Sequence, residues 1–584
     1  MHRFSVWAPL PRTVAVKLED GVYPMQAGER GWWHAEVESA GDGSDYAFLL
    51  DDDPHPYPDP RSPWQPHGVH GPSRVLDHSR FPWRDDDWQP PPFANAVLYE
   101  LHIGTFTPQG TFDAAVNRIE YLRRLGITHV ELMPVASFPG RWGWGYDGAA
   151  LYAPQERYGG PQGLKRLVDA CHAGGLAVLL DVVYNHFGPV GNYTGRFAPY
   201  ITAKHCTPWG GAVNLEEAGS DEVRRFFCDN AILWLRDYHF DGLRLDAVHT
   251  FVDRSAVHFL EQLSTEIDAL SLQLGRPRLL IAESELNDPR VVTPRSSGGW
   301  GMHAQWSDDF HHALFALLTG ERRGYYSDFG SLEQLAKALT CAYVYDGVYS
   351  PWRGRTHGRP AKHLPAHRFL GYIQTHDQVG NRAFGDRLRQ IAGTKKAMMA
   401  AAIVLTAPFI PLLFQGEEFA SSAPFLYFAD HEDPEIARAV SEGRRREHAT
   451  DTNWQSLPDP ESPETFRNSQ LNWAELDDPL HAAFLDWYRR LIALRREHAD
   501  LRDGGLGLTR VRFDESAQWL AIERGPLHIL GNFSRHVNQI ALPGCATPLL
   551  ASIQGVQFDS GLVTLPAESI AVVKVQPTSA AHET

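Results

Sequence analysis

Three carboxylates, each placed at the end of a short apolar run, are the residues of this chain best suited to chemistry. They are Asp246, Glu283 and Asp377. Cleavage of a glycosidic bond needs a nucleophile, a proton donor and a group that orients the sugar, and carboxyl groups can fill all three roles. We therefore expect a site for glycosidic bond cleavage if the fold brings these three side chains together.

Arg244 precedes Asp246 by two residues, so both side chains point to the same side of an extended strand. A buried carboxylate is costly unless it is paired, and Arg244 could hold Asp246 ionised as a nucleophile. Glu283 has no such arginine nearby in the sequence, so crowding among like charges would leave it protonated, as the acid. For Arg244 and Asp246 taken alone, an ordinary ion pair at a strand end is an equally good interpretation.

The predicted strands that carry these residues belong to a repeating pattern of strand and helix. Short apolar runs alternate with segments of helical periodicity, such as 111–125, 163–173 and 220–238. Eight such units predict an α/β fold, a closed parallel (β/α)8 TIM barrel, in which functional side chains lie at the carboxyl ends of the strands. The strands are expected at 96–103, 129–135, 176–183, 241–249, 279–284, 302–306, 369–374 and 409–414.

An all-β unit is expected on each side of the barrel, which gives three domains. Residues 1–90 alternate like the short strands of a small β-sandwich and end in a proline-rich linker. The barrel domain spans 91–502 and carries a small inserted subdomain at about 187–215, after the third strand. Residues 503–584 are expected to form a C-terminal β-sandwich.

Composition and charge disfavour several kinds of partner. The 584 residues carry a formal net charge of -17, which disfavours nucleic acid and anionic membranes as partners. The five cysteines are odd in number and lack CxxC spacing, as is typical of free thiols in a cytoplasmic protein. The chain starts directly with strand-like sequence, so no signal peptide is expected. Pro408 and Pro411 interrupt the uncharged run 397–414, which predicts a helix and a buried strand in place of a membrane span.

Four motifs are similar, in order, to the four conserved regions of the α-amylase superfamily, glycoside hydrolase family 13. They are Asp-Val-Val-Tyr-Asn-His at 181–186, Gly-Leu-Arg-Leu-Asp-Ala-Val-His at 242–249, Ile-Ala-Glu-Ser at 281–284 and Gln-Thr-His-Asp-Gln at 374–378. The resemblance covers the barrel and implies that Asp246 is the nucleophile, Glu283 the acid and base, and Asp377 the stabiliser of the transition state. It also implies substrate contacts from Tyr146, His186, Arg244, His249 and His376.

A second set of motifs resembles the maltooligosyltrehalose trehalohydrolase family over nearly the full chain. The motifs lie at 67–72, 141–148, 184–189, 325–330, 376–382 and 416–418. This resemblance implies a retaining hydrolase that cuts the α-1,4 bond next to the terminal α,α-trehalose unit of maltooligosyltrehalose, among other α-glucan oligosaccharides. It implies functional pairing with a maltooligosyltrehalose synthase. It also implies substrate contacts from Asp308, Asp309, His312, Gln378 and Asn381.

Two positions bear on how closely the family pattern applies. Gln415 stands before Gly-Glu-Glu, where the pattern suggests Met. Asn185 matches a calcium ligand of ordinary α-amylases, but no Asp-rich loop accompanies it. We therefore expect no metal ion and no cofactor.

Two other interpretations stay open. A glycogen branching or debranching enzyme would share the fold, the N-terminal sandwich and the three carboxylates, and would differ only in the acceptor. A non-catalytic glucan-binding relative would keep the barrel, although the presence of Asp246, Glu283 and Asp377 argues against that loss. Incubation with amylose distinguishes these cases through branch points, released short chains, or no product without a trehalose end.

Overall fold

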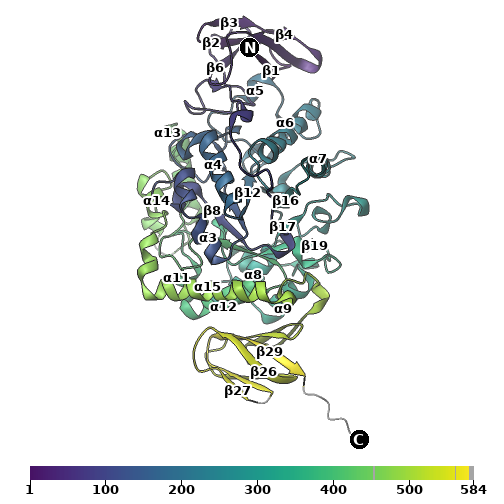
Figure 1. Ribbon diagram of the computed structural model, residues 1–584, viewed down its shortest axis with the longest axis vertical. Coiled ribbons are helices and arrows are strands. Elements are labelled where there is room, and N and C mark those ends of the chain that lie inside the picture. Colours follow the sequence, from purple (N-terminus) through teal and green to yellow (C-terminus); the bar gives the residue numbers. More distant parts are fainter. Residues whose placement is uncertain (452–453, 560, 578–584) are drawn as a thin grey trace.

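The fold has three parts stacked along the long axis of the molecule (Figure 1). The computed structural model describes residues 1–451, 454–559 and 561–577. Two small sheets near the N-terminus lie at one end, a closed barrel with its helices lies in the middle, and two sheets of C-terminal strands lie at the other end. The predicted fold class, a barrel flanked by two all-β units, is confirmed.

The barrel closes through eight parallel strands, with β21 paired to β8 so that Leu412 lies opposite Leu98. Every residue of these strands is buried, as expected for parallel strands covered on both faces. In barrel order, the strands are β8 (Leu98–Leu101), β9 (His129–Leu132), β12 (Ala177–Val182), β15 (Gly242–Leu245), β16 (Leu279–Ala282), β17 (Ala304–Trp306), β20 (Phe369–Gly371) and β21 (Ile410–Phe414).

The strands are shorter than the apolar runs that predicted them. The run 241–249 forms a strand only as far as Leu245, because Ala247 takes a left-handed backbone conformation with φ of 41°. That turn ends the ladder and directs the following residues into the loop above the barrel. The shortening matters for the site, because it moves the polar residues after each strand out of the sheet and into loops.

Helices surround the barrel, and two of the predicted helices are interrupted. The segment 111–125 forms α2 (Phe112–Val116) and α3 (Ile119–Leu125), and the segment 220–238 forms α6 (Ser220–Ile232) followed by a π-helical stretch, Leu233–Asp237. Apolar periodicity continues across both breaks, which is why one helix was predicted in each case. The other long helices are α4 (Gly160–Ala173), α7 (Phe259–Leu274), α8 (Asp308–Thr319), α9 (Leu332–Cys341), α12 (Thr394–Thr406), α13 (Pro434–Glu447) and α15 (Pro479–Glu497).

The N-terminal part consists of a three-stranded and a four-stranded sheet. The strands, in the order of each sheet, are β1 (His2–Trp7), β5 (Trp32–Val37) and β4 (Gln26–Ala27), then β3 (Gly21–Pro24), β2 (Val14–Leu18), β6 (Asp45–Leu50) and β7 (Ser73–Arg74). Side chains of this part reach the barrel helices: Arg61 Nη1 lies 2.7 Å from Asp229 Oδ2 on α6. Trp32 Nε1 donates to Glu222 on the same helix. The N-terminal sheets therefore contact the half of the barrel that contains α6.

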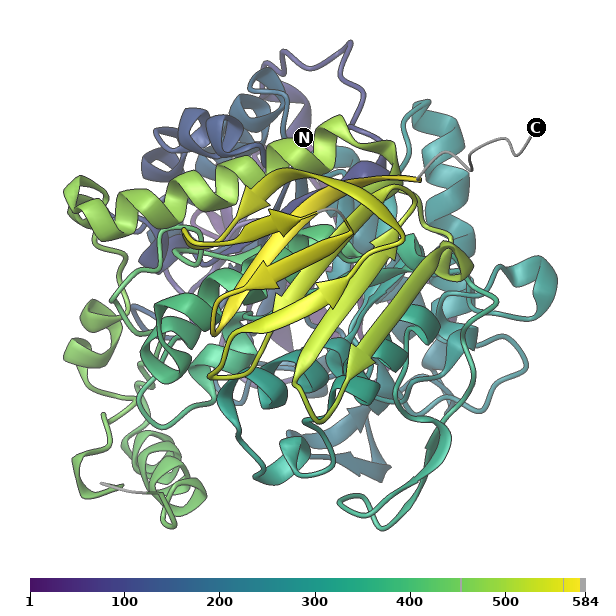
Figure 2. The same cartoon turned by 90° about the horizontal axis from the view of Figure 1, so that it is seen from below.

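The C-terminal sheets lie at the end of the molecule opposite the N-terminal sheets, with α15 running alongside them (Figure 1 and Figure 2). Buried Arg495 and Arg524 donate to carbonyls at the end of α12, which leads into the amino-terminal end of β21. These sheets therefore lie away from the carboxyl ends of the strands. Their strands, in sheet order, are β22 (Thr509–Asp514), β23 (Trp519–Arg524), β24 (Leu527–Asn532), β29 (Ser569–Pro577) and β26 (Gly544–Ala551), then β25 (Asn538–Ala541), β28 (Leu562–Leu565) and β27 (Gln557–Asp559).

The predicted insertion contains a short helix, α5 (Thr194–Phe197), and the antiparallel hairpin of β13 (Ile201–Thr207) and β14 (Gly210–Val213). The domain boundaries at 90 and 502 stay predictions, and residues 578–584 of the predicted last domain lie outside the described residues.

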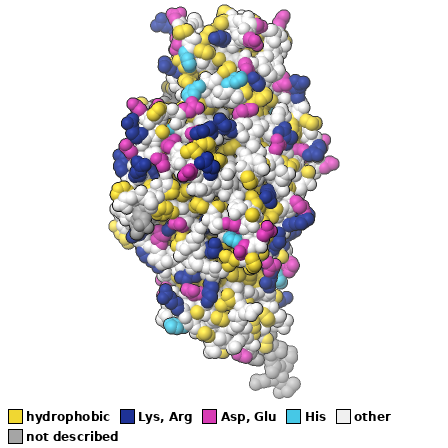
Figure 3. Space-filling model, turned by 90° about the vertical axis from the view of Figure 1, so that its left-hand side faces the viewer, with side chains coloured by type: hydrophobic (Ala, Val, Ile, Leu, Met, Phe, Trp, Pro, Cys, Tyr) yellow, Lys and Arg dark blue, Asp and Glu magenta, His cyan; other side chains and the backbone are white. Residues whose placement is uncertain are grey.

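The uncharged run 397–414 forms part of α12 and the whole of β21, as predicted. In the described part of the chain, no helix is long and apolar enough to cross a membrane. On the face shown in Figure 3, Lys and Arg side chains lie among Asp and Glu side chains, and neither sign covers the surface.

Candidate active site

A cleft of about 330 Å³ opens at the carboxyl ends of the barrel strands, and it brings the three predicted carboxylates together. Asp246 and Glu283 line it from the segments that directly follow β15 and β16, and Asp377 lines it from the short helix α10 (His376–Gly380) after β20. Five of the predicted substrate contacts line the same cleft: Tyr146, His186, His249, His376 and Asn381.

Arg244 lies beneath these carboxylates and is fully buried. Its Nη1 donates to Asp181 Oδ2 at 2.7 Å and to Asp246 Oδ1 at 2.9 Å, and its Nη2 donates to Glu283 Oε2 at 2.9 Å. The expectation that Glu283 lacks an arginine partner is therefore wrong. Strand register explains the second contact: Arg244 lies opposite Ile281 in the ladder, and Ile281 precedes Glu283 by the same two residues that separate Arg244 from Asp246.

The backbone beside Asp246 also holds Glu283. Ala247 has φ of 41° and ψ of 47°, a left-handed conformation that costs a residue other than glycine about 1–3 kcal/mol. In this conformation the Ala247 backbone N–H donates to Glu283 Oε2 at 2.8 Å. Strained backbone of this kind persists where surrounding contacts enforce it. Here it fixes the position of Glu283 Oε2 relative to the Asp246 carboxylate.

Asn185, which matched a calcium ligand in the sequence, has both ends of its amide occupied. Its Nδ2 donates to Asp246 Oδ2 at 2.9 Å, and its Oδ1 hydrogen-bonds His186 Nδ1 at 2.8 Å. Asp246 thus has Arg244 on one oxygen and Asn185 on the other. These two contacts fix the orientation of the carboxylate.

Tyr146 joins two further charged groups at the floor of the cleft. Its hydroxyl donates to Asp181 Oδ2 at 2.6 Å and lies 2.8 Å from His376 Nε2, and its ring stacks against the His376 ring. Burial raises the pKa of Asp181 to about 7, while Arg244 acts to lower it. Burial acts to lower the pKa of His376, but Asp377 and Glu100 outweigh it and raise that pKa to about 9.

The three predicted contacts on α8, Asp308, Asp309 and His312, are not among the residues that line the cleft. Asp309 Oδ2 accepts from Asn287 Nδ2 and from the backbone N–H groups of Val344 and Tyr345, at 2.7–2.8 Å. The carboxylate therefore holds the chain at 344–345, and Asp309 is not among the residues that line the cleft. Its substrate contact stays a prediction. His312 is likewise buried, where its ring packs against Tyr325 and burial lowers its pKa to about 3.

Asp308 and Gln378 have different surroundings from Asp309. Asp308 is half-buried and accepts from the Tyr372 hydroxyl at 2.6 Å. Burial raises its pKa to about 7, and the charges of Glu283 and Asp377 add to this shift. Gln378 is not among the residues that line the cleft. Its Oε1 accepts from the hydroxyl of Thr375, the residue that caps the short helix α10 (His376–Gly380), so this oxygen contributes to the start of the helix.

Five lining residues were not predicted to contact substrate: Trp144, Asp147, Trp209, Ala247 and Tyr427. Trp209 lies between β13 and β14 of the insertion, and its ring stacks on His186 with centroids 4.9 Å apart. A tryptophan at the turn of a hairpin inserted at the functional end of a barrel is a usable sequence signal for such a residue. Trp144 and Asp147 lie in the motif at 141–148, which was identified without assigning them a role.

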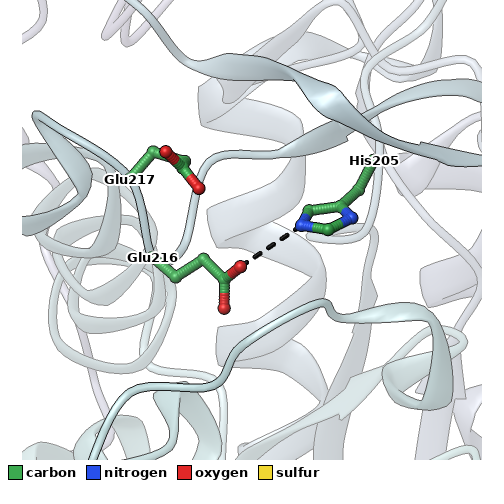
Figure 4. A group of neighbouring side chains, drawn as sticks. All are labelled: His205, Glu216 and Glu217. Carbon is green, nitrogen blue, oxygen red and sulfur yellow. Dashed lines mark hydrogen bonds and ion pairs between the residues drawn. The ribbon is translucent and has the colours of Figure 1, made fainter.

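One group of side chains has the composition of a metal site, namely His205, Glu216 and Glu217 (Figure 4). His205 Nε2 lies 3.2 Å from Glu216 Oε1. Basic side chains already pair with both carboxylates: Arg254 Nη2 lies 2.6 Å from Glu216 Oε1, and Lys204 pairs with Glu217. The group is explained as an ion-pair cluster that joins the insertion to the loop carrying Arg254, and the absence of a metal stays a prediction.

The geometry of the cleft suits attack on an anomeric carbon. Asp246 is oriented from both oxygens, while Glu283 is more exposed, with 19% of its side chain accessible against 11% for Asp246. A held carboxylate can serve as a nucleophile, and a neighbouring carboxyl group that reaches solvent can exchange protons with it. Aromatic rings of Trp144, Tyr146 and Trp209 around the cleft can stack against sugar rings.

The chain is similar to known proteins over nearly its whole length. Residues 78–199 match the family model "Alpha amylase, catalytic domain". The malto-oligosyltrehalose trehalohydrolase of Rhizobium sp. (strain M-11) is 47% identical, covering 98% of this chain and 97% of that protein, and that of Mycobacterium tuberculosis is 48% identical, covering 93% and 94%.

A crystal structure of a putative α-amylase from Salmonella typhimurium superposes with a TM-score of 0.91 at 39% identity, covering 98% of this chain and 97% of that one. The two trehalohydrolases are aligned through both flanking all-β parts as well as the barrel, so the similarity is not confined to the shared barrel. The chain belongs to the malto-oligosyltrehalose trehalohydrolase family and is a glycoside hydrolase of the α-amylase type.

Proposed function

We propose that this protein hydrolyses the α-1,4-glucosidic bond next to the terminal α,α-trehalose unit of maltooligosyltrehalose and releases trehalose and a maltooligosaccharide. The observation that carries this proposal is the set of three carboxylates in one cleft, two of them held by a single buried arginine. The family suggests the substrate: the relatives named as trehalohydrolases align with 93–98% of the chain.

In this proposal Asp246 is the nucleophile. It attacks the anomeric carbon and forms a glycosyl ester, while Glu283 gives a proton to the departing glycosidic oxygen. Formation of the ester removes the charge of Asp246, after which Glu283 takes a proton from water, the water oxygen attacks the same anomeric carbon, and the bond from that carbon to Asp246 breaks and releases the carboxylate. Two displacements at one carbon retain the anomeric configuration, so the new reducing end is α at first. Asp377 stabilises the charge and orientation of the sugar in the transition state.

The remaining cleft residues position the sugar in this scheme. Arg244 and Asn185 hold the Asp246 carboxylate in a fixed orientation at the cleft. Tyr146, His186 and His249 line the wall at which the ring would lie.

Two isosteric variants test the assignment of roles. Asp246→Asn and Glu283→Gln are expected to fold normally and to lose at least about a thousandfold in kcat, equivalent to about 4 kcal/mol. Asp268→Asn on α7 is the matched control, because its carboxylate is half exposed in an ion pair with Arg295 outside the cleft. Near-wild-type turnover by either cleft variant would remove these residues from the mechanism.

Product analysis tests the reaction itself. Maltopentaosyl-trehalose is compared with maltoheptaose under the same conditions, and proton NMR of the new reducing end is recorded early in the reaction. Trehalose released from the first substrate, with an α anomer formed first, supports the proposal. Branch points formed on amylose would favour a branching enzyme, and binding without any turnover would favour a glucan-binding relative.

The proposal also covers the cellular location and the partners of the protein. We place the protein in the cytoplasm, acting on the product of a maltooligosyltrehalose synthase, with neither nucleic acid nor membrane as partner. Its five cysteines support this setting, because each is a free thiol and a reducing compartment keeps such thiols unpaired. Co-expression with such a synthase, followed by measurement of trehalose formed from maltooligosaccharides, tests the pairing.

A further inference from the structure

A buried glutamate outside the recognised motifs lies directly behind the cleft. Glu100 occupies β8, and only 1% of its surface is exposed. Its Oε2 accepts the backbone N–H of His376 at 3.0 Å, and its Oε1 hydrogen-bonds the Nδ1 of the same residue. Glu100 therefore holds His376 by its backbone and by its ring, and His376 lines the cleft.

The other ring nitrogen of His376 also faces an acceptor. Its Nε2 lies 2.8 Å from the Tyr146 hydroxyl oxygen, and the hydroxyl proton is directed to Asp181, which is itself paired with Arg244. A ring with acceptors at both nitrogens carries a proton on each. We propose that Glu100 is a positioning residue that keeps His376 in its charged, doubly protonated form at the floor of the cleft, so that the imidazolium orients Tyr146 and Asp377.

The charges around His376 support this form. Burial opposes it, but Asp377 and Glu100 raise the pKa of His376 to about 9, against a lowering effect of Arg244. His376 Nε2 lies 3.5 Å from Asp377 Oδ1, so the positive ring faces the proposed stabilising carboxylate. The other titratable groups that interact with the ring are Asp181, Glu131 and His102. Burial lowers the pKa of His102 to about 3, so that imidazole is neutral.

Glu131 provides a matched control. It lies on β9 directly opposite Glu100 in the ladder and is equally buried, with 1% of its surface exposed. Within the described part of the chain, neither of its carboxyl oxygens has a hydrogen-bond partner. Burial, with a smaller effect of Glu100, raises the pKa of Glu131 well above its usual range, so it is neutral. Glu131→Gln therefore removes a neighbouring carboxyl group without removing a charge from the His376 environment.

The test rests on the proposed function and compares pH profiles of kcat/KM for trehalose release. Removal of the Glu100 charge lets the buried imidazole lose its proton at lower pH. Glu100→Gln is expected to lose at least about tenfold in kcat/KM near neutral pH and to move the alkaline limb at least about one pH unit toward acid. Glu131→Gln is expected to keep the wild-type kcat/KM and the wild-type position of the alkaline limb. An unchanged limb in Glu100→Gln, or the same shift in Glu131→Gln, would overturn the inference.

Two further measurements keep the test decisive. If thermal unfolding shows that Glu100→Gln does not fold, Glu100→Asp retains the charge and is expected to keep the wild-type alkaline limb despite a lower rate; a lost limb would overturn the inference. If the wild-type protein turns over neither substrate, the proposed function fails. Glu100 is then tested by the pH dependence of maltotriose binding, followed by tryptophan fluorescence. Weaker alkaline binding by Glu100→Gln supports the inference, and identical profiles reject it.

Discussion

Trp209 lies flat against His186, with ring centroids 4.9 Å apart and an angle of 10° between the planes. The tryptophan comes from the inserted hairpin and the histidine from the loop after β12, so their contact closes one side of the cleft with an aromatic wall. Trp209 is still 48% exposed, which leaves part of the ring accessible to a ligand.

We expect Trp209→Ala to weaken substrate binding more than it slows the chemical step. Loss of one stacking ring is worth about 0.5–1.5 kcal/mol beyond buried area, so KM should rise roughly three- to tenfold while kcat changes little. Steady-state kinetics on maltooligosyltrehalose measure both values. Phe513→Ala in β22, an exposed aromatic residue of the C-terminal sheet, is the control. A drop confined to kcat would show that Trp209 acts on the reaction and not on binding.

Arg244→Lys should lower kcat by at least about a hundredfold, or about 2.7 kcal/mol. A lysine keeps the charge but has a single ammonium, which cannot reproduce the planar fork that serves Asp246 and Glu283 from separate nitrogens. The measurement is kcat together with the midpoint of thermal unfolding.

The control for Arg244 is Arg254→Lys, an exposed partner of Glu216. Exposed ion pairs contribute little to stability, so this variant should keep wild-type activity and stability. If Arg244→Lys retained activity, the orientation of the two carboxylates by a forked donor would not be needed.

The barrel could be predicted because its signals are local. Each strand is a short buried run of apolar residues, and polar residues follow several of these runs, so the positions of Asp246, Glu283 and Asp377 could be read from the order of residues. Arg244 was assigned to Asp246 for the same reason, because two residues of one strand share a face. Its contact with Glu283 was missed, because that contact depends on the register between β15 and β16.

Other parts of the site depend on chain segments that carry no periodic signal. Trp209 reaches the cleft only because the insertion folds into a hairpin over His186. Asp309 appeared suited to bind a sugar, yet the chain at 344–345 folds back and takes up its carboxylate. Glu100 was given no role from the sequence, since its partner His376 is 276 residues away. Long-range contacts of this kind are set by the whole fold.

A buried network at the amino-terminal end of β15 should make stability depend on pH. His172 lies between Asp85 and Asp241, with Nδ1–Oδ2 and Nε2–Oδ2 distances of 2.8 and 3.0 Å, and the Trp88 ring stacks on it. Burial acts to lower the pKa of His172, but hydrogen bonds with Asp241 and Asp85 raise it above its usual value. The network joins the linker before the barrel to the barrel itself.

The sign follows from the direction of this shift. A histidine whose pKa is raised by folding stabilises the protein fully below its unfolded pKa of about 6.5, and this contribution is lost as pH rises through the folded pKa. His172→Gln should therefore lower the midpoint of thermal unfolding most at about pH 5–6 and progressively less toward about pH 9. His67→Gln, an exposed partner of Asp45, is the control. A difference from wild type that stays constant over this range would contradict the charged form of His172.

Asp308 and Asp309 are adjacent on α8, and their different partners predict different effects. Asp309→Ala leaves the backbone N–H groups of Val344 and Tyr345 without an acceptor, which costs about 1–3 kcal/mol for each buried group. Stability should fall, and kcat/KM on maltooligosyltrehalose and on an equal-length maltooligosaccharide should fall in the same proportion. Thermal unfolding and both sets of kinetics measure this.

Asp308→Asn should instead change the ratio between the two substrates. Burial raises the pKa of Asp308 to about 7, so the carboxyl group can either donate to or accept from a sugar hydroxyl near neutral pH. Among the residues that the structure describes, only the Tyr372 hydroxyl is bonded to this carboxyl group. If it binds the trehalose end, the preference for maltooligosyltrehalose should narrow at least about fivefold, because an unmatched buried polar group costs about 1 kcal/mol or more. Equal losses on both substrates would mean that Asp308 serves the fold or the shared reaction, and the source of specificity would then lie elsewhere in the cleft.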